Sequence, residues 1–406
     1  MRSIKNGRMT ELGLGSIVEI SRNVYSVGTV DKDRRLFDSL VPLPEGTTYN
    51  AYLVMGKQKT ALIDTTNPGF EKSLEDIIRE VTNPADLDYV IMNHAEPDHA
   101  GAIPHMMTLA KNATLVTTKI GAKMADTYYK IPADRTRTVA DGDTLDLGGK
   151  ALRFIEAPML HWPETMFTYL PEDRILFPCD FFGSHVTNGF YDDEVKDLIV
   201  HAQEYFGEIL MPFRSMAQKA LEKIKDLQME KIAPSHGPIY RNPERILEPY
   251  SRWANGETKQ KATIVYVSMW KSTEKMVHAI AETLTSDGIE ITEYNMASAS
   301  LGDVARDLVD SRAIVLGAPT VLGGAHPLGL QATNLVKVLR PPARFAVILS
   351  SYGWGGGAVR QIQETLGPSK IEIVGAIQVN GPPSDNDIEG IKQLGKTLAK
   401  RIKEEK

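Results

Sequence analysis

The sequence predicts a two-domain α/β protein, with an N-terminal αββα sandwich that carries a metal site and a C-terminal doubly wound parallel sheet. Three observations predict this architecture. The chain has 406 residues, which is too long for one ordinary hydrophobic core. Histidines and carboxylates are concentrated in residues 94–99, and strands alternate with helices from residue 262 onward. Because residues 250–261 are polar, we place the domains at 1–256 and 257–406.

Short β-rich segments in the first half predict a sheet built from hairpins. Segments 17–30, 49–54 and 60–64 alternate with turn residues. A helix is predicted from residue 68 to about residue 81, because its apolar residues recur at helical spacing. The next predicted elements are a helix, a strand, a helix and a second group of strands, at 102–111, 114–118, 120–129 and from 136 onward. Two groups of strands interleaved with helices favour a four-layer αββα sandwich with a metal site along one edge.

Four side chains that can bind metal ions lie within the six residues from His94 to His99. They are His94, Glu96, Asp98 and His99. They follow the mostly apolar run 87–92, which predicts a buried strand that ends in a loop. Such a loop can direct alternate side chains into one pocket, where they can serve two neighbouring ions. Singly, each has an ordinary explanation, such as a helix N-cap at Asp98, but the four together indicate a site for iron, manganese or zinc.

Three further candidates follow later in the chain. His161, Asp180 and His236 each come at the C-terminal end of an apolar segment, and turn-forming residues surround His161 and His236. Taken alone, they read as a core histidine, a helix or turn cap and a loop residue. As a set that follows residues 94–99 they extend the metal-site hypothesis.

The pattern His-x-Glu-x-Asp-His resembles the His-x-His-x-Asp-His signature of the metallo-β-lactamase superfamily, with Glu96 in place of the second histidine. This carboxylate adds negative charge and a harder donor, which favours a redox-active di-iron centre over a zinc hydrolase. Within the superfamily the pattern resembles that of the flavodiiron proteins, or A-type flavoproteins, and the resemblance covers nearly the whole chain. It implies reduction of dioxygen to water, of nitric oxide to nitrous oxide, or of both, with electrons relayed by FMN.

The resemblance assigns seven metal ligands by position. They are His94, Glu96 and His161 for one iron, Asp98, His99 and His236 for the other, and Asp180 as the bridge. No catalytic residue beyond these ligands is implied. Asp64 is either a support of the metal loop, as in the superfamily, or an ordinary turn residue.

The remaining histidines and the cysteine carry weaker indications. His105 and His201 read as ordinary helical side chains, and Cys179 as a small buried residue. His185 could line the gas pocket, but a position on a loop surface is favoured. The aromatic pocket candidates are Tyr25, Trp162 and Phe181.

The second domain alternates strands and helices over about 145 residues. The predicted strands are 263–267, 290–294, 313–317, 345–349 and 371–379. The predicted helices are 273–285, 304–309, 328–339, 359–366 and 387–403, the last of them a solvated outer helix. This pattern predicts a flavodoxin-like doubly wound sheet, whose ligand lies at the carboxyl ends of the strands near the topological switch point.

The candidate FMN contacts lie in the loops after the first, third and fourth of these strands. They are Ser268, Met269, Trp270, Lys271, Ser272 and Thr273, then Pro319, Thr320, Val321, Leu322, Gly323 and Gly324, and then Ser351, Tyr352, Gly353, Trp354, Gly355 and Gly356. The first loop resembles the flavodoxin phosphate loop Thr/Ser-x-Thr-Gly-x-Thr, from which Trp270 and Lys271 depart. Tyr352 or Trp354 could stack on the flavin ring. A dinucleotide glycine fingerprint is absent, which favours a mononucleotide.

Composition limits the partners. A net charge of −6 gives no basic footprint for nucleic acid, and no apolar run reaches the roughly 18 residues of a membrane span. The single cysteine excludes an intrachain disulfide and a built-in rubredoxin module, so electrons must come from an external donor. The family resemblance suggests a rubredoxin-like protein, another flavoprotein or a reduced deazaflavin coenzyme. Low cysteine use and the lack of an apolar core in residues 1–13 predict a cytoplasmic protein.

The resemblance also implies a head-to-tail homodimer, or a dimer of dimers, that places the flavin of one subunit beside the metals of the other. Two rival hypotheses remain. One is a binuclear zinc hydrolase of the metallo-β-lactamase superfamily fused to a flavodoxin domain. The other is an electron carrier with a vestigial metal loop.

Overall fold

In this computed structural model, residues 17–405 are described, so the prediction made for residues 1–13 lies outside them. The chain divides into two compact units. One contains Met1–Ala202 and Ser215–Ser251, and the other Gln203–Arg214 and Arg252–Lys406. The grouping of Gln203–Arg214 with the C-terminal unit has no counterpart in the sequence analysis. The domain boundary at residues 256 and 257 remains a proposal.

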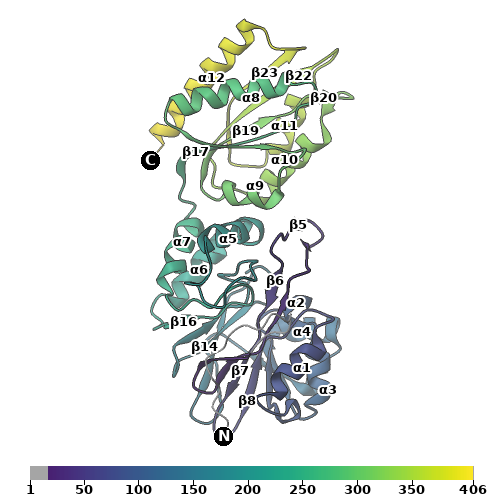
Figure 1. Cartoon of the computed structure of the whole chain (residues 1–406), viewed down its shortest axis with the longest axis vertical. Helices are drawn as coiled ribbons and strands as arrows, with labels where there is room; N and C mark the ends of the chain where they lie inside the picture. Colours follow the sequence, from purple (N-terminus) through teal and green to yellow (C-terminus); the bar gives the residue numbers. More distant parts are fainter. Residues whose placement is uncertain (1–16, 406) are drawn as a thin grey trace. The chain divides into compact units, whose positions relative to one another are not determined.

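Two sheets form the centre of the N-terminal unit (Figure 1). The first contains, in spatial order, β1 (Val18–Ser21), β2 (Val24–Ser26), β7 (Tyr52–Met55), β8 (Thr60–Ile63), β9 (Tyr89–Ile91), β10 (Thr114–Thr118) and β11 (Thr136–Val139). The second contains β12 (Thr144–Asp146), β13 (Ala151–Glu156), β14 (Met166–Leu170), β15 (Ile175–Phe177) and β16 (Lys231–Ile232). The predicted hairpin is β7 and β8, which pair antiparallel.

Alternating side chains of the first sheet serve two cores. Leu53 and Leu62 pack in one core with residues of the helices α1 (Glu71–Arg79), α3 (Ile103–Leu109) and α4 (Lys119–Tyr129). Tyr52, Val54 and Ile63 point the other way and pack against the second sheet. This period of two is what a strand buried on both faces requires. The structure therefore confirms the predicted sandwich.

The remaining elements up to residue 255 are mostly short, and α7 (Glu244–Asn255) packs against the second sheet through aromatic contacts. Phe181, behind β15, contacts Phe167 of β14 and Tyr250 of α7, with ring centroids 5.6 and 5.1 Å away. The helical segments are η1 (Pro84–Asp86), α2 (Pro97–Ala100), η2 (Ala133–Arg135), α5 (Leu198–Tyr205), η3 (Phe206–Leu210), η4 (Met211–Phe213), α6 (Arg214–Ile224) and α7 (Glu244–Asn255). Of these, η3 and η4 lie in the stretch Gln203–Arg214 that is grouped with the C-terminal unit. Two small strand pairs are β3 (Thr29–Asp31) with β6 (Thr47–Tyr49), and β4 (Leu36–Phe37) with β5 (Val41–Pro42).

The C-terminal unit contains a five-stranded parallel sheet in the order β18, β17, β19, β22, β23. These strands are Glu290–Asn295, Lys259–Tyr266, Ser311–Gly317, Phe345–Tyr352 and Glu372–Asn380. In sequence order this is 2-1-3-4-5, the order of the flavodoxin-like fold, with its switch point between β17 and β19. The predicted doubly wound sheet is confirmed.

Five helices cover this sheet (Figure 1). They are α8 (Ser272–Ser286), α9 (Leu301–Leu308), α10 (Pro327–Leu339), α11 (Ala358–Leu366) and α12 (Asp385–Glu404). Helices α8 and α12 share one hydrophobic core with the sheet, and α12 contributes the buried Ile391, Leu398 and Ile402 to it. The last helix is thus solvated on one side only, because its apolar stripe lies against the sheet.

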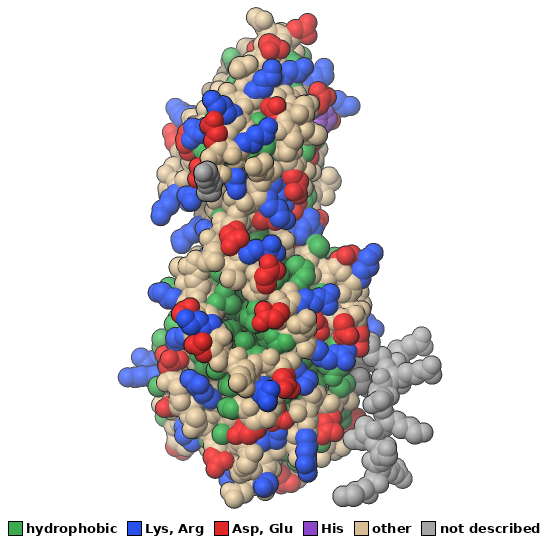
Figure 2. Space-filling model, turned by 90° about the vertical axis from the view of Figure 1, so that its left-hand side faces the viewer, with side chains coloured by type: hydrophobic (Ala, Val, Ile, Leu, Met, Phe, Trp, Pro, Cys, Tyr) green, Lys and Arg blue, Asp and Glu red, His purple; other side chains and the backbone are tan. Residues whose placement is uncertain are grey.

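Charged side chains of both signs cover the face of the molecule drawn in Figure 2. On the face drawn in Figure 2, basic and acidic side chains are interspersed, without a continuous basic patch. Within residues 17–405, no helix combines the length and apolar character that crossing a membrane requires.

Candidate metal centre

The first four candidate ligands lie directly after β9, where the chain leaves the sheet and enters α2. Glu96 precedes this short helix, Pro97 is its first residue, and Asp98 and His99 lie in its first turn. Asp64 at the end of β8 fixes the start of the loop, because its carboxylate accepts hydrogen bonds from the backbone N–H of Asn93 at 2.8 Å and from its amide at 3.0 Å. Of the two predicted roles for Asp64, the structure favours support of the metal loop.

The other three candidates lie in loops of the second half of the sandwich. His161 follows β13, Asp180 follows β15 and His236 follows β16. A close approach holds the last of these loops. Gly237 has a φ of +78°, and a Cβ atom there would lie 2.3 Å from the hydroxyl oxygen of Ser184. Only glycine fits this position without displacing Ser184, so the loop that carries His236 is held close to the loop of Asp180.

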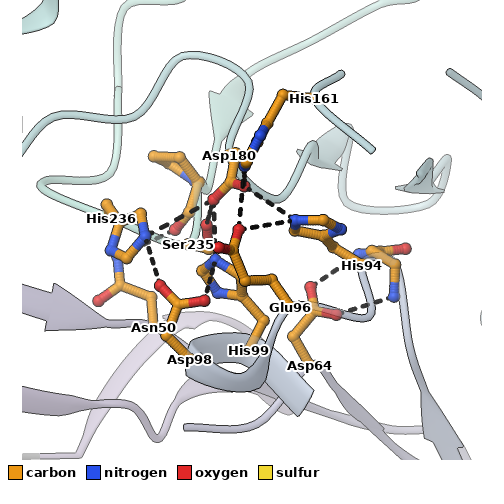
Figure 3. A network of polar contacts seen from close by, with 12 residues as sticks. Asn50, Asp64, His94, Glu96, Asp98, His99, His161, Asp180, Ser235 and His236 are labelled. Atoms are coloured by element: carbon orange, nitrogen blue, oxygen red, sulfur yellow. Dashed lines mark hydrogen bonds and ion pairs between the residues drawn. The ribbon is translucent and has the colours of Figure 1, made fainter. Parts of the chain in front are cut away.

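The seven side chains converge into two adjoining groups. One contains His94, Glu96, His161 and Asp180, and the other Asp98, His99 and His236. Figure 3 shows Asp180 between them. Its Oδ2 atom lies 3.4 Å from His94 Nε2 and 3.5 Å from His161 Nε2, while its Oδ1 atom lies 2.9 Å from His99 Nε2 and 3.6 Å from His236 Nε2. One carboxylate therefore presents one oxygen to each group, as a bridging ligand must.

The oxygens of Glu96 and Asp98 lie at similar distances from the imidazole nitrogens. Glu96 Oε2 lies 3.2 Å from His94 Nε2 and 3.0 Å from His161 Nε2. Asp98 places one oxygen 3.3 Å from His99 Nε2 and the other 3.2 Å from His236 Nε2. Neighbouring donors around a metal with bonds of about 2.1 Å lie about 3 Å apart when they subtend a right angle. The donor atoms are spaced as two metal ions require.

The donor set is buried, and its carboxylates need cations or protons beside them. His94, His99 and His236 are fully buried, and Asp180 is 1% exposed. Both carboxylate oxygens of Asp98 lack a hydrogen-bond partner among the described residues. Burying carboxylates without neighbouring positive charge is costly, and the site concentrates three carboxylates. Cations bound between the two groups would remove this cost, so the residues present fit a pair of divalent metal ions.

In the metal-free site, the pKa values of two of the histidines are raised and the pKa of Glu96 is lowered. Burial lowers the pKa of His94, but hydrogen bonds to Glu164 and Glu96 outweigh it and raise that pKa to about 10. For His161, burial is likewise outweighed by Asp180 and Glu96, and its pKa rises to about 10. The pKa of Glu96 falls to about 2, because both of these imidazoles outweigh its burial. Protons thus take the place of the cations that this cluster would hold.

The weaker candidates fall into those that lie at the site and those that pack elsewhere. The favoured loop-surface position of His185 is wrong, since its ring lies 4.9 Å from that of His236 and its Nδ1 atom 2.9 Å from the Thr47 hydroxyl oxygen. Trp162 is at the site, with its ring centroid 5.1 Å from that of His94. Tyr25 packs with the helix-side core of the first sheet, and Phe181 with the aromatic residues of α7. Cys179 is buried, as expected, although its sulfur lies near the donor atoms of His99 and Asp180.

Sequence reasoning missed three residues that contact the predicted ligands. Glu164 Oε1 lies 2.7 Å from His94 Nδ1. The hydroxyl of Ser235 donates to Asp180 Oδ1 at 2.9 Å, and the carbonyl oxygen of Thr48 lies 2.6 Å from His236 Nδ1. Ser235 is the neighbour of a ligand, and Glu164 follows His161-Trp162-Pro163, so proximity in the chain was a usable signal for both. Thr48 lies in a strand far from any ligand in sequence.

The predicted flavin loops lie at the carboxyl ends of β17, β19 and β22, and hydrogen bonds join them. The hydroxyl oxygens of Thr273 and Ser351 are 2.9 Å apart, and the Thr320 hydroxyl oxygen accepts from the backbone N–H groups of Gly357 and Ala358 at 3.3 Å. Trp270 is 85% exposed, and Leu322 and Trp354 are both 94% exposed. Large apolar side chains at the tips of three joined loops are typical of a surface that binds a ligand or a partner.

Comparisons with known proteins agree with the two-domain fold. Residues 47–237 match the family model described as "ODP family beta lactamase". The chain is 38% identical to a nitric oxide reductase of Moorella thermoacetica, covering 95% of this chain and 98% of that protein. It is 34% identical to a coenzyme F420H(2) oxidase of Methanocaldococcus jannaschii, covering 96% and 97%.

Two solved structures match over both units. Rubredoxin oxygen:oxidoreductase from Desulfovibrio gigas has a TM-score of 0.92 and 28% identity, and the match covers 96% of this chain and 99% of that one. The flavodiiron protein of Giardia intestinalis has a TM-score of 0.90 and 30% identity, covering 96% and 97%. A metallo-β-lactamase-like domain that brings together two groups of histidines and carboxylates, followed by a flavodoxin-like sheet, defines a class of two-domain oxidoreductases. The chain belongs to the flavodiiron protein family.

Proposed function

We propose that this protein is a flavodiiron oxidoreductase that reduces dioxygen to water, nitric oxide to nitrous oxide, or both, at a non-haem di-iron site. The observation that carries the proposal is the convergence of four imidazoles and three carboxylates into two groups that share Asp180. Relatives whose names state nitric oxide reduction and F420H(2) oxidation match nearly the whole chain, which supports this activity.

The chain's own residues would hold and orient the two metals. His94, Glu96 and His161 would bind one ion, Asp98, His99 and His236 the other, and Asp180 both. Bound irons supply one-electron redox chemistry to a gas molecule, and the flavin supplies the electrons. The three carboxylates offset much of the charge of two ferrous ions, so a neutral gas can enter a buried site without a counterion.

FMN is the cofactor that the loops after β17, β19 and β22 would bind. The first loop leads into the N-terminus of the 15-residue helix α8, where backbone N–H groups favour a phosphate. The other two loops would cover the faces of the flavin ring, with Trp354 or Tyr352 stacked on it. The exposed apolar tips of these loops support the head-to-tail homodimer implied by the family, since burial against a partner would remove them from water.

The electron donor is an external one. A reduced deazaflavin coenzyme is supported by the name of the Methanocaldococcus jannaschii relative, and a rubredoxin-like protein by the name of the Desulfovibrio gigas structure. The single, buried Cys179 offers no cysteine cluster for an iron–sulfur carrier within the chain. Low cysteine use also supports a location in the cytoplasm.

One experiment tests this function against the two rivals. The protein is purified anaerobically, its metals and flavin are quantified, and the reduced protein is exposed in parallel to dioxygen and to nitric oxide. We expect two irons and one FMN per chain and consumption of at least one gas. Zinc in the purified protein, together with hydrolytic activity, would indicate the fused hydrolase. A substitution in the metal loop that changes neither the metal content nor the gas consumption would indicate the electron carrier.

The matched substitutions are Asp180→Asn and Asp192→Asn. Both aspartates are buried in the same unit, but Asp192 accepts a hydrogen bond from the backbone of Arg241 and lies outside the two donor groups. Asp180→Asn should lower iron content and abolish gas reduction, because it removes the shared charge. Asp192→Asn should leave the iron content and the gas reduction of the folded protein unchanged.

A further inference from the structure

The two donor groups contain the same kinds of metal ligands but differ in the residues that contact those ligands. Each group has two imidazoles, one terminal carboxylate and one oxygen of Asp180. A difference in redox behaviour between two irons held there must therefore come from the residues that contact the ligands. This inference rests on the proposed di-iron function.

Glu164 is one of these residues. Its side chain is fully buried, and Oε1 lies 2.7 Å from His94 Nδ1. The same oxygen accepts a hydrogen bond from the backbone N–H of Ala95 at 2.7 Å, and the backbone carbonyl of Glu164 accepts one from the Thr118 hydroxyl at 2.9 Å. The carboxylate is therefore fixed in place. Because a carboxylate only accepts, the His94 ring donates from Nδ1. Once a metal ion displaces the proton of the other nitrogen, Nε2 would be the lone-pair nitrogen, facing Glu96 and Asp180.

The second donor group lacks an equivalent contact at His99. The Nδ1 atom of His99 has no hydrogen-bond partner among residues 17–405, and the Nδ1 atom of His236 lies 2.6 Å from a neutral acceptor, the carbonyl oxygen of Thr48. Asp64, the other buried carboxylate behind the ligand loop, gives both of its oxygens to Asn93 rather than to an imidazole. His94 is thus backed by a charged acceptor, and His236 by a neutral one.

The bridging carboxylate is polarised in the same direction. The hydroxyl of Ser235 donates a 2.9 Å hydrogen bond to Asp180 Oδ1, the oxygen 2.9 Å from His99. Oδ2, which faces His94 and His161, takes no such hydrogen bond from a hydroxyl in the described contacts. A donated hydrogen bond withdraws electron density from Oδ1, so the second group receives the weaker half of the bridge.

We propose that Glu164 makes the two metal positions electronically unequal, so that the iron held by His94, Glu96 and His161 has the lower reduction potential of the pair. A carboxylate behind a ligating imidazole makes that imidazole a stronger donor, and a stronger donor stabilises the ferric ion more than the ferrous ion. This iron is consequently the second to be reduced and the first to give up an electron. Glu164 acts through His94 and is a positioning residue.

The test is a stepwise anaerobic reduction of the iron- and FMN-loaded protein with dithionite. Electron paramagnetic resonance follows the mixed-valence state, which exists only between the two iron potentials. Glu164→Gln should raise the lower of the two iron potentials. The range of potential over which the mixed-valence signal is seen should therefore become narrower. A tenfold loss in the preference for ferric over ferrous iron corresponds to about 59 mV for a one-electron couple.

Glu75→Gln is the matched control. Glu75 is also a buried carboxylate held against an imidazole, with its Oε2 atom 2.8 Å from His105 Nε2, but this pair is outside both donor groups. It should leave both iron potentials unchanged. If Glu164→Gln does not yield folded loaded protein, Glu164→Asp keeps the charge but withdraws it by one methylene. It should shift the same potential in the same direction by less.

The outcomes separate this inference from the proposed function. If Glu164→Gln binds two irons per chain and the potential range of the mixed-valence signal is unchanged or wider, the proposed role of Glu164 is wrong. The proposed di-iron function would not be affected by that result. A wild-type chain that binds no iron would overturn the function itself. Equal upward shifts of both potentials would also contradict the inference, because they would show a general loosening of the site rather than an effect through His94.

Discussion

At the scale of single residues, the candidate metal centre is a cluster of buried charges that cations or protons must neutralise. In the metal-free chain, Asp98 and Asp180 outweigh the effect of burial and raise the pKa of His99 to about 9. His94 and His161 reach about 10. An ordinary histidine has a pKa near 6.5, so these three imidazoles remain charged well above neutral pH.

Metal uptake should therefore be coupled to proton release. A ligating imidazole must be neutral, so iron has to displace the protons of His94, His99 and His161 at pH 7. The sign follows from the raised pKa values. Proton competition weakens metal binding at low pH, and affinity rises with pH until the imidazoles deprotonate near pH 9 to 10.

Calorimetry of anaerobic Fe²⁺ addition, in two buffers of different ionisation enthalpy, measures the number of protons released. We expect the number to fall as pH rises from 7 to 10. A His105→Asn variant should release as many protons as the wild type, because His105 lies outside the two donor groups. Affinity that does not change between pH 6 and 9 would contradict the raised pKa values.

At the scale of elements, the predicted site residues lie at strand ends or in the segments that follow them. The three loops of the C-terminal sheet approach one another so closely that some positions have no room for a side chain. A Cβ atom at Gly357 would lie 1.9 Å from the backbone carbonyl oxygen of Gly323, whereas one at Gly355 would meet nothing within 4 Å. The third- and fourth-strand loops are held together at this point.

Gly357→Ala should therefore weaken FMN binding, because the two loops must separate to admit the methyl group. Overpacking of this kind costs about 1–3 kcal/mol, or about a 5- to 150-fold loss of affinity if the bound state bears all of it. Gly390→Ala is the control and should bind FMN as the wild type does, because Gly390 lies in α12, outside these loops, and a Cβ atom there meets nothing within 4 Å. Fluorescence titration of the flavin-free proteins measures both constants. Equal affinities in the two variants would show that these loops do not form the flavin site.

At the scale of the whole molecule, the proposed head-to-tail dimer predicts complementation between two inactive variants. Asp180→Asn removes the metal centre but keeps the flavin loops, and Gly357→Ala impairs flavin binding but keeps the metal ligands. A mixed dimer unites one intact flavin site with the intact metal centre of its partner. Gas consumption should therefore reappear when the two variants are dissociated, mixed and reassociated.

The control for this experiment is each variant taken through the same cycle alone, which should remain inactive or weakly active. Sedimentation analysis establishes that mixed dimers have formed. Mixed dimers without recovered activity would contradict electron transfer between subunits. An active monomer in the wild-type preparation would contradict the dimer itself.

The sequence determined the parts of this protein that follow local rules. Alternation of strands and helices indicated the doubly wound sheet, since parallel strands need crossover helices. The cluster from His94 to His99 indicated a metal site, since four donors in six positions at a strand end have few other uses. His161, Asp180 and His236 were found with the help of the family resemblance, and the fold brings them to the same place.

Only the tertiary structure decided which residues act behind the ligands. Glu164 contacts His94 across 70 positions, and Thr48 contacts His236 across 188. The closeness of Glu164 to His161 in the chain marks it as a candidate, but no periodicity or local motif encodes which ligand it contacts. For the same reason His185 was assigned to a loop surface, although the fold turns its ring toward that of His236. Ligand identity is set by chemistry that a short motif can carry, whereas ligand environment is set by the packing of distant segments in three dimensions.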